Sequence, residues 1–286
     1  MKIKDILAQD KPVLSFEVFP PKQEDAFESV EKAAFEIAKL NPAFMSVTYG
    51  AGGGTSKYTV NIASDLKKQF GVTALAHLTC VSSTKEHVHH VVEQLKEHDI
   101  HNIMALRGDI PADGKIEHDY KYASELIYEL KAMGDFCIGG ACYPEGHVES
   151  RTKAEDIIHL KEKVDAGCDF LTTQMFFDND VLYNFLYQVR DKGITVPVVA
   201  GIMPVTNAKQ MKKIFTMSGA QIPAKFKAIV DKFGDNPAAM RQAGVAYATD
   251  QIVDLIANGV NAIHVYSMNK PDVAAQIKNS LSEIII

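Results

Sequence analysis

A carboxylate stands in the middle of an apolar segment near the start of the chain. Glu17 lies within 14–19 (LSFEVF), and Pro12 and Pro20 bound that stretch. An ionised carboxylate is costly to bury, so such a group is either paired or held neutral with a raised pKa. A neutral carboxylic acid beside a pocket is suited to general acid catalysis, whereas a paired carboxylate is often structural. The segment alone leaves both interpretations open.

Polar groups also stand at the ends of other apolar segments. Seven of the eight apolar segments in this chain end in such groups. They are Glu17, Thr48 with Tyr49, His77, Arg107 with Gly108 and Asp109, Tyr143 with Glu145 and His147, Gln174, and Asn269 with Lys270. A packed core does not place so many polar groups at equivalent positions by chance. This repetition predicts a functional site built from the segment ends.

Two short motifs at these ends have alternative interpretations. The stretch 48–55 (TYGAGGGT) is rich in glycine, which permits close approach of a ligand, but it matches neither GxGxxG nor a P-loop. A ligand-binding loop and a plain flexible loop both fit it. In Arg107-Gly108-Asp109, the two charges address opposite ends of a ligand or form a structural ion pair.

A histidine cluster lies on a predicted helix at 84–98. His87, His89 and His90 fall there without a carboxylate partner set, so we expect a solvated helix face and no metal site. His77 is the better functional candidate, because it lies near the end of an apolar segment.

Asp156, His159 and Lys163 recur at helical spacing within 152–166. They face either solvent or a ligand. Gln174 is a neutral polar group in an aromatic segment and is suited to orienting a heteroaromatic ring by paired hydrogen bonds.

The elements that carry these groups alternate regularly. Strand-like segments occur at 14–19, 44–49, 73–80, 102–108, 137–143, 170–177, 197–203 and 262–268. Helix-period segments occur at 24–40, 56–70, 84–98, 120–133, 152–166, 178–192, 206–218 and 237–258, with an extra helix at 223–233. Regular alternation indicates a parallel sheet with right-handed crossovers. We therefore predict a single α/β domain over 1–286, a (β/α)8 TIM barrel with its chemistry at the C-terminal ends of the strands.

The composition is that of an ordinary globular protein. The 286 residues are 47% hydrophobic and 23% charged, with a net charge of −6. The acidic balance predicts no nucleic-acid binding, and no apolar run has the length of a membrane span. The N-terminus lacks the features of a signal peptide, so we expect a cytoplasmic protein. Cys80, Cys137, Cys142 and Cys168 form no CxxC pair, which predicts buried free thiols.

Eight motifs in order give the chain a family resemblance. They are SFEVFPP, VTYGAGGGT, HLTC, ALRGD followed by Pro111, AxYPEGH, KxKVDAGxDFxxTQMFFD, GIMPV and HVYSMNK, spread over about residues 12–272. Together they resemble the FAD-dependent methylenetetrahydrofolate reductases of bacteria, in the form that consists of the catalytic domain.

The resemblance implies a barrel that holds FAD noncovalently at the C-terminal mouth. NADH or NADPH, with NADH the expected donor, reduces the flavin and leaves. Methylenetetrahydrofolate then takes the same place and receives the hydride in a ping-pong scheme, which forms methyltetrahydrofolate for methionine synthesis. Such a transient donor needs no dinucleotide-binding fingerprint of its own. Homo-oligomerisation stays open.

The resemblance also implies residue roles. Glu17 corresponds to the general acid that opens the five-membered ring of the folate, and Asp109 to the carboxylate near flavin and pterin. The implied cofactor contacts are Thr48, Tyr49, Ala51, His77, Arg107, Gly108, Asp109, Tyr122, Ala123, Tyr143, His147, Asp156, His159 and Lys163. The implied substrate contacts are Glu17, Asp109, Gln174, Gln210 and Lys270.

Three departures from the family pattern involve four positions. Ile214 replaces a phenylalanine that packs on the substrate in some relatives, and His159 and Glu162 replace an amide and an arginine near the FAD phosphates. Lys270 replaces an arginine that addresses the glutamate tail of the folate, which keeps the charge but loses the bidentate fork. Two alternatives to the reductase stay open: a flavin-free barrel lyase or aldolase that uses Glu17 and Asp109 as acid and base, and a noncatalytic folate- or nucleotide-binding barrel.

Overall fold

Parallel strands form a closed barrel in a computed structural model that describes residues 1–9, 11–21, 24–49, 56–81, 83–110, 119–211, 214–215 and 220–285. The strands are β1 (Val13–Val18), β2 (Met45–Val47), β3 (Ala74–Thr79), β4 (Asn102–Leu106), β5 (Cys137–Cys142), β6 (Phe170–Thr173), β7 (Val198–Ile202) and β8 (Ala262–Tyr266). Each strand pairs with its sequence neighbour, and β8 closes the barrel against β1. The predicted (β/α)8 barrel is confirmed.

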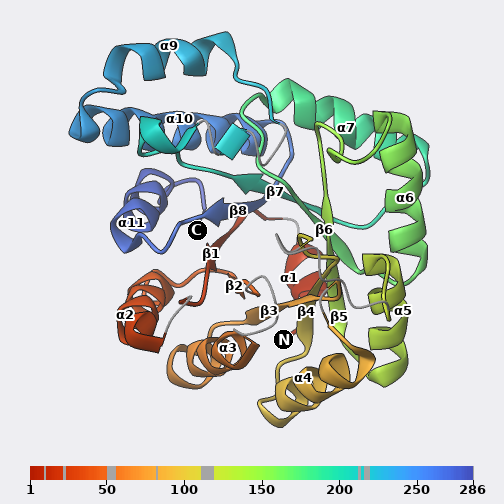
Figure 1. Cartoon of the computed structure of the whole chain (residues 1–286). Helices are drawn as coiled ribbons and strands as arrows, with labels where there is room; N and C mark the ends of the chain where they lie inside the picture. Colours follow the sequence, from red (N-terminus) through yellow and green to blue (C-terminus); the bar gives the residue numbers. More distant parts are fainter. Residues whose placement is uncertain are drawn as a thin grey trace.

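All but one of the described helices surround the barrel (Figure 1). The helices are α1 (Ile3–Leu7), α2 (Phe27–Ala38), α3 (Ser56–Phe70), α4 (Lys85–Glu97), α5 (Ala123–Met133), α6 (Lys153–Asp165), α7 (Asn179–Asp191), α9 (Ala224–Phe233), α10 (Pro237–Ala257) and α11 (Pro271–Ser280). The sequence analysis did not predict α11, the helix that follows β8. Both α9 and α10 lie between β7 and β8, and α9 packs on the outer side of α10 (Figure 1). Within the predicted helix at 206–218, five residues lie outside the described part of the chain.

The main core lies between the strands and the surrounding helices. Phe16, Val47 and Ile263 point outward from their strands and are fully buried, together with helix residues such as Ile37 and Leu66. Side chains alternate along a strand, so the residues beside these outward ones face the barrel interior. This alternation directs Glu17 inward, where the register places it beside Ser46 of β2 and Tyr266 of β8.

Threonine side chains cap the starts of two helices. The Thr84 hydroxyl accepts a hydrogen bond from the backbone N–H of His87 at the start of α4. Thr152 accepts from the backbone N–H of Glu155 at the start of α6. The Glu155 carboxylate, however, accepts from the backbone of Arg151, so the reciprocal bond of a capping box to Thr152 is not the one formed.

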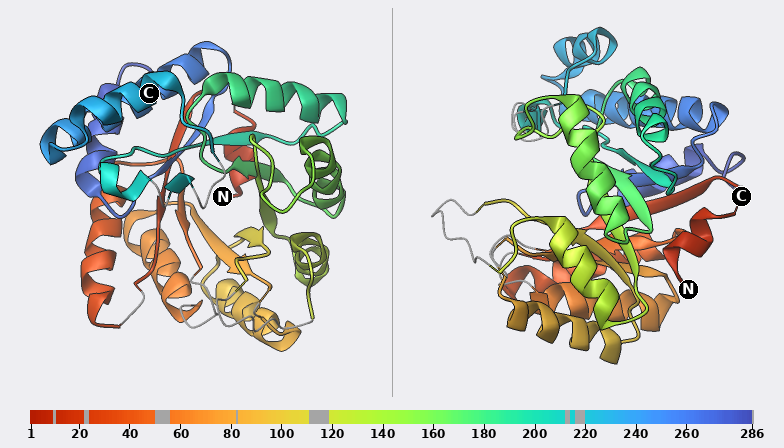
Figure 2. Two further views of the ribbon diagram at one scale, coloured as in Figure 1. Left: turned by 45° about the horizontal axis from the view of Figure 1, so that its top comes forward. Right: turned by 90° about the vertical axis from the view of Figure 1, so that its right-hand side faces the viewer.

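The short helix α1 covers the N-terminal end of the barrel. Ile3 is fully buried against interior residues such as Phe44 and Phe170. Its backbone N–H donates to the Asn102 side chain at 2.8 Å, and the Asn102 amide donates to the carbonyl of Met1 at 3.1 Å. Both chain termini lie at this end of the barrel (Figure 2, right), so the opposite end is free for a site.

The four cysteines are free and buried, as predicted. None of the helices that the structure describes is long and apolar enough to cross a membrane.

Candidate active site

A cavity of about 680 Å³ opens among the C-terminal ends of the strands. This volume lies within the usual range of small-molecule sites. Most of the predicted site residues line it: Glu17, Thr48, Tyr49, His77, Arg107, Gly108, Asp109, Tyr122, Ala123, Tyr143, His147, Asp156, His159, Lys163 and Gln174. The barrel therefore brings together side chains that the sequence spreads over more than half of the chain.

Of the other predicted residues, Lys270 lies outside this lining, whereas Ala51 and the Gln210 side chain lie outside the described part of the structure. The Lys270 ammonium donates to the Thr206 hydroxyl at 2.7 Å, which joins the end of β8 to the loop after β7. Gln210 lies in a short 3-10 helix, Ala208–Gln210, but its side chain lies outside the described part of the structure. Ala51 lies outside the described residues altogether.

Glu17 is surrounded by hydrogen-bonding groups at the base of the cavity. The Ser46 hydroxyl donates to its Oε2 atom at 3.4 Å. The Nε2 atoms of His77 and His264 lie 3.8 Å and 3.9 Å from the same oxygen. The carboxylate is thus enclosed on several sides, although it still borders the cavity.

His264 belongs to a buried network that reaches Glu17 from below. Its Nδ1 lies 2.7 Å from the Ser15 hydroxyl, which donates to the Ile263 carbonyl at 3.0 Å. Because the Ser15 proton goes to that carbonyl, Nδ1 carries the imidazole proton and donates to Ser15. Nε2 of the same ring lies 3.0 Å from Ser46 Oγ. Ser46 Oγ therefore lies between His264 and Glu17.

These neighbours determine the charge state of Glu17. Burial raises the pKa of this carboxyl, but the hydrogen bond and charge of His264, the charge of His77 and the Ser46 hydroxyl more than offset it. The net effect is a pKa below the ordinary value of 4.5. Of the two interpretations that the sequence left open, the structure supports the paired carboxylate. The pKa of Glu17 is lowered and not raised.

Two buried polar atoms on the cavity wall have no hydrogen-bond partner among the described residues. They are Nε2 of His77 and Oγ1 of Thr172. The His77 side chain is about nine-tenths buried, and burial lowers its pKa to about 4, although the Glu17 charge acts in the opposite direction. His77 is therefore a neutral imidazole at neutral pH. Unpartnered buried atoms of this kind are suited to a polar ligand.

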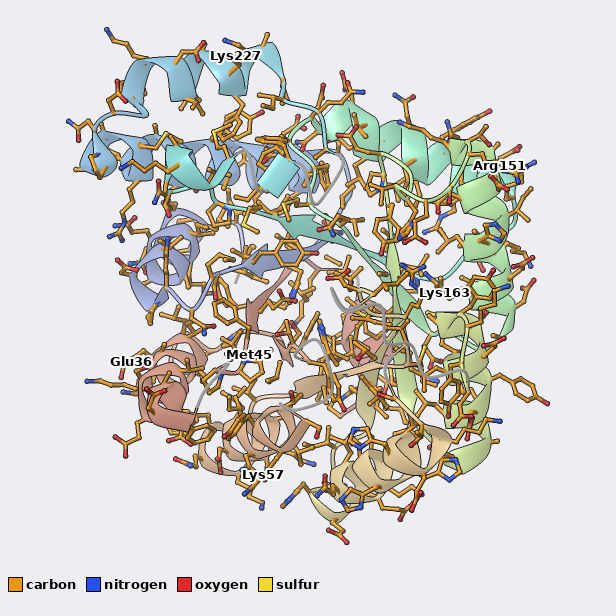
Figure 3. The ribbon with its side chains drawn as sticks, in the orientation of Figure 1. Glu36, Met45, Lys57, Arg151, Lys163 and Lys227 are labelled. Atoms are coloured by element: carbon orange, nitrogen blue, oxygen red, sulfur yellow. The ribbon has the colours of Figure 1, made fainter. Side chains whose placement is uncertain are left out.

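Lys163 reaches the cavity from α6. Its ammonium donates to the Ala141 carbonyl at the end of β5, at 2.6 Å, and burial lowers its pKa. In Figure 3 it lies on the barrel side of the helix, whereas Glu36 and Lys57 lie at the periphery. Asp156 is also buried and accepts from the Ser150 hydroxyl at 3.1 Å. The solvated face that was one interpretation of this helix is thus wrong for both residues.

The rim of the cavity is held by an ion pair. Both terminal nitrogens of Arg107 donate to Glu149, at 2.6 Å and 2.7 Å. Among the described residues Arg107 makes no ion pair with Asp109, so the structural Arg–Asp interpretation is wrong. Further out, His159 lies 3.3 Å from the Glu162 carboxylate, and both side chains are largely exposed.

One histidine of α4, His87, differs from the expected solvated face, whereas His89 and His90 are exposed. His87 lies 2.8 Å from the hydroxyl of Tyr49, a cavity residue, and is only partly exposed. His89 pairs with Glu129 on α5. His90 is exposed, as predicted. Among the residues that the structure describes, no group of three or more His, Cys, Asp and Glu side chains is arranged to hold a metal ion.

Sequence reasoning missed several residues of the site. Ser46, Glu149, His264 and Tyr266 all contribute to its geometry. The sequence could have indicated His264 and Tyr266. Both lie in the apolar segment 262–268, at alternate positions that face the barrel interior. Glu149 had no such signal, because it lies in an irregular loop and only its contact with Arg107 marks it.

The fold and the site define a class of protein. The chain is a (β/α)8 barrel with a ligand-sized, polar cavity at the C-terminal mouth and an enclosed carboxylate at its base, which is the arrangement of barrel enzymes.

Comparisons with known proteins identify the family. The family model for methylenetetrahydrofolate reductase matches residues 2–282. The chain is 35% identical over 268 residues to 5,10-methylenetetrahydrofolate reductase of Pectobacterium carotovorum, with 94% of this chain and 89% of the relative covered. It is 35% identical to the Escherichia coli K12 enzyme of the same name, with 94% and 90% covered. The chain belongs to the methylenetetrahydrofolate reductase family.

A plant relative and a solved structure extend these comparisons. Methylenetetrahydrofolate reductase (NADH) 1 of Arabidopsis thaliana is 34% identical, and the match spans 94% of this chain and 48% of that protein. Among solved structures, an uncharacterised protein from Clostridium thermocellum that binds two copies of 5-methyl-5,6,7,8-tetrahydrofolic acid superimposes with a TM-score of 0.68. It is 14% identical and covers 100% of both chains, so it supports the barrel fold alone.

Proposed function

We propose that this protein is a flavin-dependent methylenetetrahydrofolate reductase. It uses NAD(P)H to reduce 5,10-methylenetetrahydrofolate to 5-methyltetrahydrofolate, in two half-reactions that share one cavity. The observation that carries the proposal is the cavity itself: residues matching the cofactor and substrate positions of the family meet there, with Glu17 at its base. The bacterial relatives named for this activity match over nearly their whole length.

The chemistry of the cavity wall fits FAD. Buried polar atoms of His77 and Thr172 without partners among the described residues suit the polar edge of a flavin ring. Lys163 offers further N–H donors beside its bond to the Ala141 carbonyl, and Arg107 supplies a planar cation at the rim. These residues, with Tyr143 and His147, would hold the cofactor noncovalently. When bound, FAD supplies the hydride chemistry, accepting from NAD(P)H and donating to the folate.

Glu17 has the role of proton donor to the folate. Its neighbours lower its pKa, so this role requires that Glu17 gain a proton when the folate binds. A ligand ring that covers the cavity removes water, which raises the pKa of an enclosed carboxyl. Ser46 and His264 also give the carboxylate a hydrogen-bonded connection to the barrel interior.

The substrate side of the cavity is built from β6 and from the loop after β7. The side-chain oxygen of Gln174 accepts from the backbone N–H of Met175 at 2.9 Å, which leaves its amide N–H groups to donate to a pterin ring. Ile214, at the position of a phenylalanine in some relatives, packs against an apolar cluster with Phe177 and Met203. Asp109 and Gln210 are further proposed contacts, and Lys270, held near Thr206, is proposed to meet the glutamate tail.

NADH is the proposed donor, because plant relatives that this chain matches over 48% and 50% of their length are named for NADH. The proposed catalytic unit is one domain, the barrel over residues 1–286. Four free, buried cysteines suit a reducing compartment, so the cytoplasm is the proposed location. The proposed partners are small molecules.

The test uses the colour of the cofactor. Purified protein supplied with FAD should be yellow, its flavin absorbance should bleach with NADH, and it should return with methylenetetrahydrofolate under anaerobic conditions. Colourless protein that gains no activity when FAD is added would overturn the proposal. Flavin that bleaches but is not reoxidised by the folate would leave an NADH oxidoreductase with a different acceptor.

A further inference from the structure

Glu149 occupies a central position at the rim of the cavity. It lies in the loop between β5 and α6, and its two carboxylate oxygens accept from the two terminal nitrogens of Arg107, at 2.6 Å and 2.7 Å. The Arg107 Nε also donates to the Gly108 carbonyl at 3.3 Å. Three hydrogen bonds therefore hold the planar guanidinium in one orientation. This clamp joins the end of β4 to the loop after β5.

The same residue also orients His147. The backbone N–H of Glu149 donates to Nδ1 of His147 at 3.2 Å. Nδ1 must then be unprotonated, so the neutral imidazole carries its proton on Nε2. The ring stands edge-on to Tyr143, with 4.6 Å between the ring centroids and an interplanar angle of 85°. Glu149 thereby determines which nitrogen of His147 is a donor.

The ion pair between Arg107 and Glu149 contributes little to the stability of the fold. The side chains are 24% exposed for Arg107 and 53% for Glu149, and ion pairs this open to solvent add little to the stability of a fold. Its main consequence lies in the cavity, which Arg107, Tyr143 and His147 all line. A held guanidinium and a defined tautomer are preorganised for a ligand, which lowers the entropic cost of binding.

We propose that Glu149 is a positioning residue for the cofactor. Its side chain acts through Arg107 and its backbone N–H through His147, so substitution of the side chain tests the Arg107 contact. The inference rests on the proposed function, in which this cavity holds FAD. With both terminal nitrogens of Arg107 engaged by Glu149, the open faces of the guanidinium are left for an aromatic or polar ligand. The pair therefore persists when the cofactor binds, and its removal loosens the site.

The first experiment measures FAD affinity directly. Apoprotein of the wild type, Glu149→Gln and Glu149→Ala is titrated with FAD, and binding is followed by quenching of flavin fluorescence. We expect the dissociation constant to rise by about fivefold or more in both variants, the effect of losing a preorganised contact. The control is Asp165→Asn, which removes an ion pair with Lys161 on α6 whose carboxylate is similarly exposed, at 59%. That variant should bind FAD as the wild type does.

A double-mutant cycle separates positioning from a general structural effect. In an Arg107→Gln background, Glu149→Gln should change the dissociation constant less than about twofold, because the group through which it acts is gone. Equal effects of Glu149→Gln in both backgrounds would contradict the proposal. Thermal unfolding of each apoprotein checks folding, and Glu149→Gln, which keeps the size of the side chain, carries the test if Glu149→Ala does not fold.

Two other results would contradict the positioning role of Glu149. Unchanged affinity in Glu149→Gln shows that the pair is a surface contact only. Tighter binding shows that Glu149 competes with the cofactor for Arg107. Either result overturns the positioning role alone, provided that the wild type binds FAD. A wild type that binds no FAD overturns the proposed function and this inference with it.

Discussion

Nε2 of His264 and Oε2 of Glu17 lie 3.9 Å apart, and the Ser46 hydroxyl contacts both, at 3.0 Å and 3.4 Å. The two residues come from β8 and β1, the strands whose pairing closes the barrel. The proposed acid of the site is therefore defined by the closure of the fold. Its neighbours lower its pKa, so the role proposed for Glu17 as proton donor requires it to gain a proton during the reaction.

Glu17→Gln should separate the two half-reactions. The amide keeps the size of the side chain but cannot supply the proton that opens the folate ring. We expect flavin reduction by NADH at close to the wild-type rate, and folate reduction reduced by at least about a hundredfold, within the range of lost acid catalysis. Stopped-flow flavin absorbance measures both steps. Comparable losses in both half-reactions would show that Glu17 has another role.

His264→Phe should raise the pKa of Glu17. Phenylalanine retains the aromatic ring that stacks on Phe44 but removes a group that lowers this pKa. A general acid must be protonated, so the folate half-reaction falls as the pH rises through that pKa. The descending limb should move to higher pH in the variant.

The measurement for this variant is the rate of flavin reoxidation by the folate as a function of pH. His90→Phe, which changes an exposed histidine of α4, serves as the control and should keep the wild-type profile. If the descending limb moves to lower pH, or does not move in a folded His264→Phe protein, His264 does not lower the pKa of Glu17.

His77 should make the protein less stable in mild acid. Burial lowers its pKa from 6.5 to about 4 in the folded protein, so between these values the unfolded chain binds more protons. Stability therefore falls as the pH drops from 6.5 towards 4, and the part due to His77 amounts to about 3 kcal/mol. Well above pH 6.5, His77 is neutral in both the folded and the unfolded protein, and it no longer makes the stability depend on pH.

Urea unfolding of the wild type and His77→Gln across this pH range tests the assignment. The variant should lose distinctly less stability between pH 6.5 and pH 4. Parallel curves for the two proteins would mean that His77 titrates normally. Acids that do not interact with His77 contribute to both curves alike and cancel in the difference, whereas Glu17, whose pKa the His77 charge lowers, does not.

Asn102→Leu should destabilise the closed end of the barrel and leave the cofactor site intact. The Asn102 side chain bonds the backbone of Met1, Ile3 and Ala74, and it is buried. Leucine is of similar size but leaves these groups unpaired, which should cost about 1–3 kcal/mol. Urea unfolding measures the loss, and the FAD dissociation constant should not change.

Asp135→Asn is the matched control for this end of the barrel. It removes the exposed partner of Lys2 and should have no measurable effect on unfolding. A loss of FAD affinity in Asn102→Leu would show that the two ends of the barrel are coupled, contrary to this expectation.

The sequence by itself determined the architecture and the place of the site. Strand-like segments such as 14–19 and 262–268 alternate with helix-period segments, and parallel strands in a closed barrel all end at one mouth. For this reason the polar groups at the segment ends, from His77 to Gln174, were expected in one cavity, and the structure places them there. The order of the motifs was enough to indicate the family.

Only the tertiary structure decided how these groups are paired. From the sequence, Glu17 could be a neutral acid or a paired carboxylate, and Arg107 could be the partner of Asp109. Barrel closure brings His264 to Glu17, and an irregular loop brings Glu149 to Arg107. Periodicity reports which face of an element is buried, but the partner of a charge depends on distances between segments far apart in the chain. Because a few ångströms decide a pKa, the charge state of the site could be read only from the folded protein.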